Sequence, residues 1–201
     1  MNVLIACEYS GRVREAFRKR GHNAWSCDLL PAEDGSQHHH QGDVLEYLRI
    51  FCHKDGGGLP FHLIIAHPPC THLCSSGARW WPSKVNQQLE AVSFFISFTG
   101  LKCKWAIENP IGLMSKKYKK PSQIIQPHMF GHPEFKSTCL WLNGLPPLLA
   151  TNQLPIPERG SPERIAWNRV HRMSPGPDRW KDRSRTYQGI ADAMAEQWGT
   201  P

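Results

Sequence analysis

Cys70 is the side chain of this sequence best placed for covalent chemistry, because it directly follows Pro68 and Pro69. The segment from Phe61 to Ala66, which is apolar except for His62, predicts a buried strand that ends just before this loop. Two consecutive prolines restrict the backbone and would hold the thiol in one position. Such a thiol can act as a nucleophile where nearby positive charge favours the thiolate. A lone cysteine is more often a small buried residue, so its position on this loop is what favours catalysis.

The same loop carries residue types that can bind zinc, namely His67, Cys70, His72 and Cys74. Their separations do not match the spacing of zinc-finger ligands. We therefore predict no metal site. A zinc module stays open as an alternative, which metal analysis of the purified protein would test.

Glu108 is the second candidate for chemistry. It opens the triplet Glu108-Asn109-Pro110, which follows a strand predicted over residues 104–107. A carboxyl group whose pKa is raised by burial can give a proton to a ring nitrogen. The alternative is an acid in an ordinary turn at a strand end.

Three further polar segments follow predicted strands. The turn over residues 7–11 precedes a predicted helix, so its backbone N–H groups could bind a ligand. Asp28 closes the next strand and could accept hydrogen bonds from a ribose. Asp43, in Gly42-Asp43-Val44, could accept from the amine of an adenine. The structural alternatives are an ordinary strand–helix turn, a turn acid and a helix N-cap.

The alternation of strands and helices predicts an α/β fold with a mostly parallel sheet. Ligands of such sheets bind outside the carboxyl ends of the strands, where all of these candidate segments lie. This shared position is the main argument for an enzyme. The expected elements are strands at 3–6, 23–27, 61–66 and 104–107, helices at 12–20, 85–101 and 185–198, a loop at 31–41, a glycine turn at 56–58 and a Pro-rich region at 143–182. The helix at 85–101 would bury Leu89, Val92, Phe95 and Ile96 on one side.

The composition fits one globular domain of 201 residues, with 40% hydrophobic residues and eight Trp. These values exclude a wholly disordered or coiled-coil protein. The longest aliphatic run, residues 63–66, is too short to span a membrane, and the first residues do not resemble a signal peptide. The seven cysteines form no regular framework, which indicates reduced thiols and a cytoplasmic protein. The net charge of +7 favours a polyanion such as nucleic acid, although charge that serves solubility is the alternative.

Taken together, the order and spacing of these segments resemble the catalytic core of the DNA (cytosine-5) methyltransferases, and a short phage- or prophage-like member in particular. Pro68-Pro69-Cys70 resembles the nucleophile loop of that family, with Gly77 matching a downstream glycine. Trp105 to Pro110 resembles its Glu-Asn-Val/Pro motif. The remaining similar segments are the first cofactor turn at 6–11, the ribose-binding acid Asp28, the adenine-contacting motif at 42–44, a degraded Gln-x-Arg-x-Arg strand at 130–138 and the last cofactor-contacting helix at 186–194.

The resemblance implies a Rossmann-like class I methyltransferase fold, with helices on both faces of the sheet, in one catalytic domain over residues 1–201. It also implies transfer of a methyl group from S-adenosylmethionine to C5 of cytosine in DNA, through a covalent bond between Cys70 and C6. The catalytic residues would be Cys70, Glu108 at N3 and Lys136 at O2. The cofactor-binding residues would be Glu8, Tyr9, Ser10, Gly11, Asp28, Leu29, Asp43, Val44, His67, Pro68 and Gly189. The substrate-binding residues would be Pro69, Ser76, Arg79, Trp80, Asn109, Pro110 and Arg185, the last at a phosphate.

The sequence departs from the family at several positions. Glu8 and Ser10 stand where the cofactor turn usually has glycines, and Cys74 stands where serine is usual. The arginine with which the family holds the cytosine O2 is absent, and Lys136 is the nearest cationic residue that could replace it. Ile190 stands where the last motif of the family usually has an asparagine. The family also carries a target recognition domain, for which this chain has only the Pro-rich residues 143–182. We therefore expect low or very short sequence specificity.

We expect nucleic acid, most of all DNA, as the partner, no membrane association, and a monomer or weak homodimer. Two alternatives stay open. One is the same chemistry on RNA or on a free cytosine nucleotide. The other is a non-catalytic nucleic-acid-binding protein on a decayed methyltransferase fold, which S-adenosylmethionine would not stabilise against heat.

Overall fold

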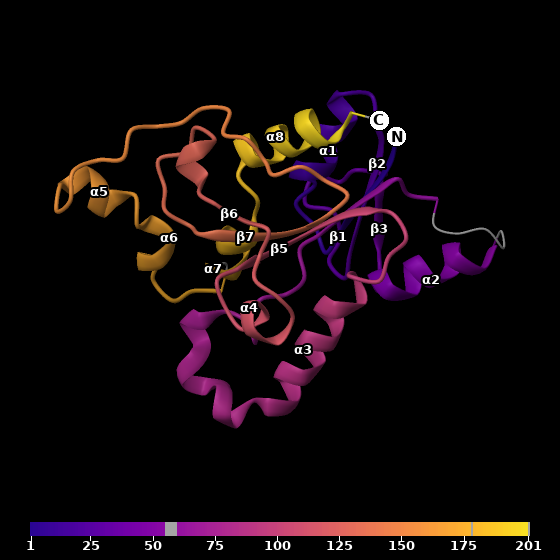
Figure 1. Ribbon diagram of the computed structural model, residues 1–201, viewed down its shortest axis with the longest axis horizontal. Helices are drawn as coiled ribbons and strands as arrows, with labels where there is room; N and C mark the ends of the chain where they lie inside the picture. The colour runs from indigo at the N-terminus through magenta and orange to yellow at the C-terminus, as the bar shows by residue number, and fades with distance from the viewer. Residues whose placement is uncertain (55–59, 178, 201) are drawn as a thin grey trace.

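The computed structural model describes residues 1–54, 60–177 and 179–200, and the glycine turn predicted at 56–58 lies outside them. Within these residues a seven-stranded sheet forms the centre of the protein, with the order β3-β2-β1-β4-β5-β7-β6 (Figure 1). Strands β1 to β5 pair in parallel, and β7 runs antiparallel to both neighbours, β5 and β6. The strands are β1 (Asn2–Ala6), β2 (Asn23–Asp28), β3 (His39–Gln41), β4 (Leu63–Ala66), β5 (Lys104–Pro110), β6 (Gln123–Ile125) and β7 (Thr138–Asn143).

Helices cover both faces of this sheet. In Figure 1, α1 and α8 lie along one side and α2 and α3 along the other. The α-helices are α1 (Arg12–Lys19), α2 (Val44–Lys54), α3 (Val85–Ser97), α4 (Met114–Lys117), α5 (Pro162–Ala166), α6 (Arg169–Arg172), α7 (Arg179–Ser184) and α8 (Gln188–Trp198). Two 3-10 helices, η1 (Ser75–Ser83) and η2 (Pro127–Met129), complete the described helices. The expected Rossmann-like α/β fold, with a mostly parallel sheet and helices on both faces, is confirmed.

Two hydrophobic cores hold the layers together, because successive side chains of a strand face opposite sides of the sheet. One core joins alternate residues of β1 and β4 to helices α1 and α8, and includes Val3, Ile5, Leu63, Ile65, Phe17 and Met194. The other core joins the intervening strand residues to α2 and α3, and includes Leu4, Ala6, Ile64, Ala66, Leu48 and Phe95. Since these central strands are apolar on both faces, they read as continuous hydrophobic runs in the sequence.

The strand directions bring distant segments to one edge of the sheet. The parallel strands β1, β2, β4 and β5 all end there, so the residues that follow them are neighbours. Because β7 is antiparallel, it begins where those strands end, and Thr138 pairs with Pro110. Lys136, two positions before Thr138, therefore lies at the same edge although it precedes its strand. We call this edge the carboxyl edge.

Several boundaries differ from the sequence predictions. The loop expected at 31–41 ends in strand β3, where His39 to Gln41 pair with Ser26 to Asp28 of β2. The helix expected at 85–101 ends at Ser97, and the one expected at 185–198 begins at Gln188. Strand β5 includes the Glu108-Asn109-Pro110 triplet, which was expected just after it, because all three residues pair with β7.

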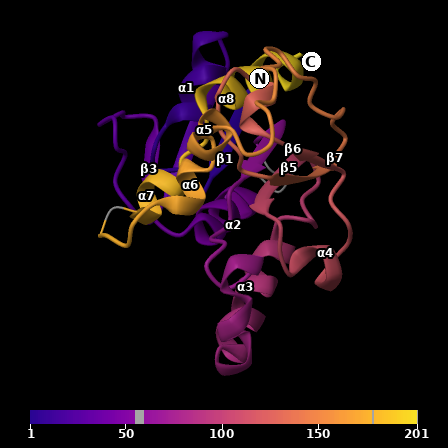
Figure 2. The ribbon, with the colours of Figure 1, turned by 90° about the vertical axis from the view of Figure 1, so that its left-hand side faces the viewer.

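Three further predictions were wrong: the buried side of helix α3, the start of the strand expected from residue 130, and the loop character of residues 143–182. On α3 only Phe95 of the four expected apolar residues is fully buried, whereas Leu89 and Ile96 are exposed, because much of this helix projects beyond the sheet (Figure 2). The strand expected from residue 130 begins at Thr138. The Pro-rich region 143–182 contains α5, α6 and the start of α7, so it is not only loop. Among the described residues, no helix is both long enough and apolar enough to cross a membrane.

Candidate functional site

The loop that carries Cys70 is fixed from two sides. The Asn109 side chain is buried and donates a hydrogen bond from Nδ2 to the carbonyl of Pro68, at 2.8 Å. The carbonyl of Cys70 accepts from the N–H groups of Leu73 and Cys74, at 3.0 and 2.9 Å, which closes a tight turn. Cys70 is therefore held by its neighbours on β5 and by its own turn. Asn109, predicted to contact substrate, positions this loop.

A second set of contacts joins the following residues to the end of β5. Leu113 donates its N–H to the carbonyl of Leu73 at 2.8 Å, and Cys74 forms a β-bridge with Gly112. A Cβ atom at Gly112 would overlap the carbonyl of Leu73, so a glycine is needed for this close approach. The remaining thiol of the loop, Cys74, lies 3.1 Å from the Ser76 hydroxyl.

The Cys70 thiol is protonated at neutral pH in the free protein. Desolvation by the surrounding chain raises its pKa to about 11, and the negative charges of Cys74 and Glu108 act in the same direction. The positive charge of Lys136 lowers the pKa but does not outweigh them. The residue as a whole is nonetheless exposed, so a substrate can reach it. The thiolate thus has to form when a substrate binds.

His67 and Glu108 form the closest polar pair of this edge. His67 Nδ1 lies 3.1 Å from Glu108 Oε2, and their side chains are only 10% and 17% exposed. The register of the sheet makes this contact, because Ala66 pairs with Ile107 and the two residues in contact each come one position later. His67 was predicted to contact a cofactor, and its place beside Glu108 was not foreseen. The other ring nitrogen, Nε2, is buried and has no hydrogen-bond partner among the described residues.

The expected direction of the Glu108 pKa was wrong for the free protein. Burial raises the pKa of Glu108, but the hydrogen bond and charge of His67, with the charge of Lys136, outweigh burial and lower it below its usual range. The free protein therefore holds Glu108 as a carboxylate. A proton has to be supplied before Glu108 can donate one.

Lys136 completes this group of residues, which we call the Cys70 centre: Cys70, His67, Glu108 and Lys136. Its charge acts on both Cys70 and Glu108. The ammonium group donates a hydrogen bond to the carbonyl of Arg183 at 2.7 Å and lies 5.6 Å from the centre of the Tyr187 ring. The three predicted catalytic residues thus meet at one edge. In the described part of the chain, no three His, Cys, Asp or Glu side chains are grouped so that they could hold a metal ion.

The lowered pKa of Glu108 predicts how the stability of the protein depends on pH. An unfolded glutamate titrates near pH 4.3, so a lower native pKa stabilises the fold above that pH, and this contribution is lost as the pH falls through the native pKa. Between about pH 5 and pH 3, wild type should lose more unfolding free energy than Glu108→Gln. Urea unfolding at a series of pH values measures the difference. Glu163→Gln, at an exposed carboxyl group, controls for the loss of one carboxylate, and parallel curves for wild type and Glu108→Gln would contradict the assignment.

The turn after β1 is built differently from what the sequence suggested. Glu8 is buried, and its carboxylate accepts hydrogen bonds from the N–H groups of Val13 and Arg14, at 2.7 and 3.2 Å. These N–H groups at the start of α1 are therefore occupied by the protein itself. Burial raises the pKa of Glu8, against the charge of His67 and these hydrogen bonds. Cys7, with φ +60°, has a left-handed backbone that costs energy for a non-glycine residue, and such strain is often found at functional sites.

The remaining residues of this turn face different partners. The Ser10 hydroxyl approaches Glu8 Oε1 at 3.4 Å, and the Tyr9 ring lies 5.9 Å from that of Trp180 on α7. Gly11 is the N-cap of α1 and has φ +70°. A side chain at Gly11 would be strained by this backbone and would overlap the buried guanidinium of Arg14.

The two aspartates both bind backbone in the free protein. Asp28 accepts from the N–H of Leu30 at 2.9 Å through Oδ1, and burial raises its pKa. Asp43 accepts from the N–H groups of Leu45 and Glu46, at 2.7 and 3.2 Å, and so caps α2. The N-cap alternative for Asp43 is thus correct. Of the residues beside them, Leu29 is 72% exposed and Val44 is buried in the second core.

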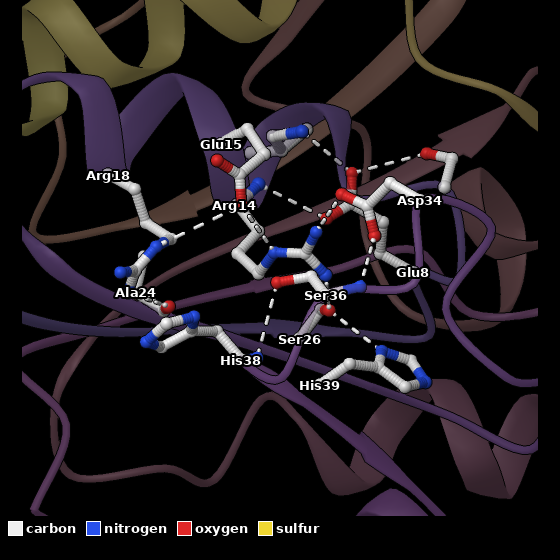
Figure 3. A network of polar contacts seen from close by, with 12 residues as sticks. Glu8, Arg14, Glu15, Arg18, Ala24, Ser26, Asp34, Ser36, His38 and His39 are labelled. Atoms are coloured by element: carbon white, nitrogen blue, oxygen red, sulfur yellow. Dashed lines mark hydrogen bonds and ion pairs between the residues drawn. The ribbon is translucent and has the colours of Figure 1, made fainter.

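A buried arginine positions the chain between β2 and β3 (Figure 3). Arg14 is fully buried and pairs with Asp34, while it also donates to Ser26 Oγ at 2.8 Å and to Glu15 Oε1 at 3.0 Å. Ser26 in turn lies 2.8 Å from Nδ1 of His39, on β3. Figure 3 shows these side chains converging between α1 and the loop that carries Asp34. No sequence pattern indicated this network.

The other predicted ligand-binding residues have varied surroundings. Gly189 packs so closely on the carbonyl of Phe130 that a Cβ atom would overlap it, and its N–H donates to His132 Nε2 at 2.9 Å. Arg185 pairs with Glu33 and, at 2.6 Å, with Asp182, so its guanidinium is already neutralised.

The predicted substrate residues beyond the Cys70 loop are on η1 and β5. Trp80 is 55% exposed, with the Arg79 guanidinium 4.9 Å from its ring centre, on the arm formed by η1 and α3. Ser76 is exposed on the same arm, Pro69 is exposed while Pro68 is buried, and Pro110 ends β5.

Comparisons with known proteins identify no family. Neither a scan against protein families nor a search of curated proteins finds a match. Among solved structures, the chain is similar to a protein of E. coli described as a candidate DNA modification methyltransferase encoded within a prophage, with 18% sequence identity and a TM-score of 0.48. The similarity covers 71% of this chain and 46% of that protein, so this chain spans less than half of its length. The strand order by itself defines the fold.

Proposed function

We propose that this protein transfers a methyl group from S-adenosylmethionine to C5 of cytosine in DNA, through a covalent bond between Cys70 and C6. The observation that carries the proposal is the Cys70 centre, in which an exposed thiol on a fixed loop, a carboxylate and an ammonium group interact at the carboxyl edge. This set matches what cytosine requires, because C5 is a poor nucleophile until a group has added to C6.

The cofactor would bind at the ends of β1, β2 and β4, next to this centre. Asp28 lies at the end of β2 and is held by the backbone N–H of Leu30, and its carboxylate would accept a hydrogen bond from a ribose hydroxyl. The exposed side chain of Leu29 offers an apolar surface to an adenine ring. Nε2 of His67 is a buried polar atom without a partner among the described residues, so a polar ligand at this edge would satisfy it. These features fit S-adenosylmethionine, which when bound would supply the methyl group.

In the proposed mechanism each residue of the Cys70 centre acts at a different atom of the cytosine ring. Cys70 Sγ forms the bond to C6. The thiol proton that it loses passes to N3 through Glu108, which is a carboxylate in the free protein and can therefore accept it. Lys136 orients the O2 atom and stabilises negative charge there. Once C5 carries the methyl group, a water molecule accepts the C5 proton, and the electron pair of that C–H bond restores the C5–C6 double bond while Sγ leaves C6 as a thiolate. The N3 proton then returns through Glu108 to Sγ, which regenerates the thiol and the carboxylate. A target base in a duplex would have to leave its stack to reach Cys70.

The short segment over residues 143–182, in place of a full target recognition domain, supports low sequence specificity. It also leaves RNA or a free cytosine nucleotide as a substrate for the same chemistry. The net charge of +7 favours a polymer over a free nucleotide.

Transfer of labelled methyl groups tests this proposal directly. Methyl-labelled S-adenosylmethionine is incubated with unmodified single-stranded DNA, duplex DNA, RNA and dCTP, and the products are identified by mass spectrometry of nucleosides. We expect label in 5-methylcytosine of DNA. Label only in RNA or only in dCTP would show that the substrate is not DNA, while the proposed reaction at C5 of cytosine would stand. The absence of label in all four, together with no thermal stabilisation by S-adenosylmethionine, would favour the non-catalytic nucleic-acid-binding protein.

A further inference from the structure

Helix α7 lies directly against the Cys70 centre. The Lys136 ammonium group, which acts on Cys70 and Glu108, donates its hydrogen bond to the carbonyl of Arg183 on α7. On its other side, α7 contacts the turn after β1 through the ring of Tyr9, which lies 5.9 Å from that of Trp180. In Figure 2, α5, α6 and α7 form one group at the front of the molecule. A molecule that places one ring in the Cys70 centre would therefore extend its neighbouring groups over α7.

The side chains of α7 form a hollow with the chemistry of a nucleic-acid contact. Arg179, Trp180 and Arg183 line a hollow of about 280 Å³ together with Pro175 and Gly176. Trp180 is 49% exposed. Two guanidinium groups suit phosphate oxygens, and an exposed indole suits the face of a base. We call these three side chains the α7 cluster.

The two arginines of this cluster differ from the neighbouring Arg185 in their acidic partners within residues 1–54, 60–177 and 179–200. Arg185 is paired with Glu33 and Asp182 and so fastens the end of α7 to the loop after β2. Among the residues that the structure describes, neither Arg179 nor Arg183 has an acidic partner, and Nε of Arg179 is buried without a hydrogen bond. A buried donor of a charged group is costly without an acceptor, so an anion from outside would satisfy it. The helix is thus held in place, and no carboxylate in the described part of the chain neutralises its two cations.

We infer that the α7 cluster binds the single strand on either side of the target cytosine, with Arg179 and Arg183 at phosphates and Trp180 stacked on a flanking base. This inference rests on the proposed function for the identity of the target base. The end of the region 143–182, which stands in place of a recognition domain, would then bind the DNA strand through α7. Since phosphates and base faces are common to all sequences, this contact supplies affinity and not sequence specificity.

The salt dependence of binding tests the two arginines. Fluorescence anisotropy measures the affinity of a labelled single-stranded oligodeoxynucleotide, without cofactor, at a series of salt concentrations. For Arg179→Gln with Arg183→Gln, the slope of log affinity against log salt should fall by about 1.4, because each phosphate contact on a single strand contributes about 0.7. The affinity at about 0.1 M salt should fall by roughly 25-fold on the same relation.

Trp180→Ala separates stacking from charge. It should weaken binding by about tenfold and leave the salt slope unchanged, since a lost stacked base releases no counterions. The matched control is Lys102→Gln with Lys104→Gln, which removes two exposed charges at the opposite end of β5 and should leave the slope as in wild type. Circular dichroism and thermal unfolding verify that all variants are folded.

Three results would overturn the inference: no binding by the wild-type protein, an unchanged slope in the double arginine variant, or an equal loss in the lysine control. Equal competition by dCTP and by the oligonucleotide would also overturn it, because it would show a site for a single nucleotide. The binding assay involves no methyl transfer. A reduced salt slope in the double arginine variant, without any labelled product from wild type, would support binding by the α7 cluster and contradict the proposed function. Labelled product with an unchanged slope would support the proposed function and contradict binding by the α7 cluster.

Discussion

Cys70→Ala is expected to abolish methyl transfer and to prevent covalent capture of a cytosine-containing strand. The thiol is the group that would add to C6, and removal of a catalytic nucleophile lowers rates by at least about a thousandfold. The substitution removes one sulfur atom from an exposed residue, while the contacts that fix the loop are made by Asn109 and by the Cys70 backbone. We therefore expect the variant to keep its fold and its affinity for DNA.

Covalent capture is measured with an oligonucleotide that carries 5-fluorocytosine, together with S-adenosylmethionine. Fluorine at C5 cannot leave as a proton, so the bond between Sγ and C6 persists and the complex survives denaturing electrophoresis. Mass spectrometry of the digested complex identifies the modified peptide. The control is Cys103→Ala, at a partly buried thiol that precedes β5, which should form the complex as wild type does. A complex that forms in Cys70→Ala would show that another group is the nucleophile.

Arg14→Met is expected to have the largest effect on stability, lowering the unfolding free energy by roughly 3 kcal/mol. The guanidinium is fully buried and binds Asp34, Glu15 and Ser26. Its removal leaves Ser26 Oγ without this donor and takes away one of the anchors of the loop that carries Asp34 (Figure 3). Because that loop follows Asp28, we also expect weaker binding of S-adenosylmethionine.

The matched control for Arg14 is Arg18→Met, one turn further along the same helix. Arg18 is partly exposed and lies 3.9 Å from the carboxylate of Glu15, so its removal should lower the unfolding free energy by less than about 1 kcal/mol. Urea unfolding of both variants gives the two values. Equal small losses would mean that the buried pair contributes little beyond an apolar side chain of the same size.

Much of the fold follows from local patterns in the sequence. The runs at 3–6 and 63–66 are apolar throughout, and they lie in β1 and β4 in the middle of the sheet, where both faces are covered. The Pro68-Pro69-Cys70 loop could be placed because a loop that follows a central parallel strand must lie at the carboxyl edge. In contrast, His39 to Gln41 are polar and form a strand only by pairing with β2, so no local signal marked β3.

The set of residues that meet in the Cys70 centre depends on contacts between segments far apart in the sequence, which local patterns do not predict. Cys70, Glu108 and Lys136 were identified from their types and order, through the family resemblance. The antiparallel direction of β7 brings Lys136 to the carboxyl edge, and the register of β4 and β5 sets His67 against Glu108. That contact reversed the expected direction of the Glu108 pKa, since a hydrogen bond and nearby positive charge outweigh burial.

The sequence by itself determined the central strands β1, β2, β4 and β5, the helices α1, α3 and α8, and which loops could carry chemistry, because burial imposes a short period on neighbouring residues. Only the tertiary structure decided which polar groups meet. Arg14 lies among the apolar residues of α1 and is fully buried, because Asp34 and Ser26 approach it from other elements. Such pairings depend on strand direction, register and loop path, and these are set by the packing of the whole chain.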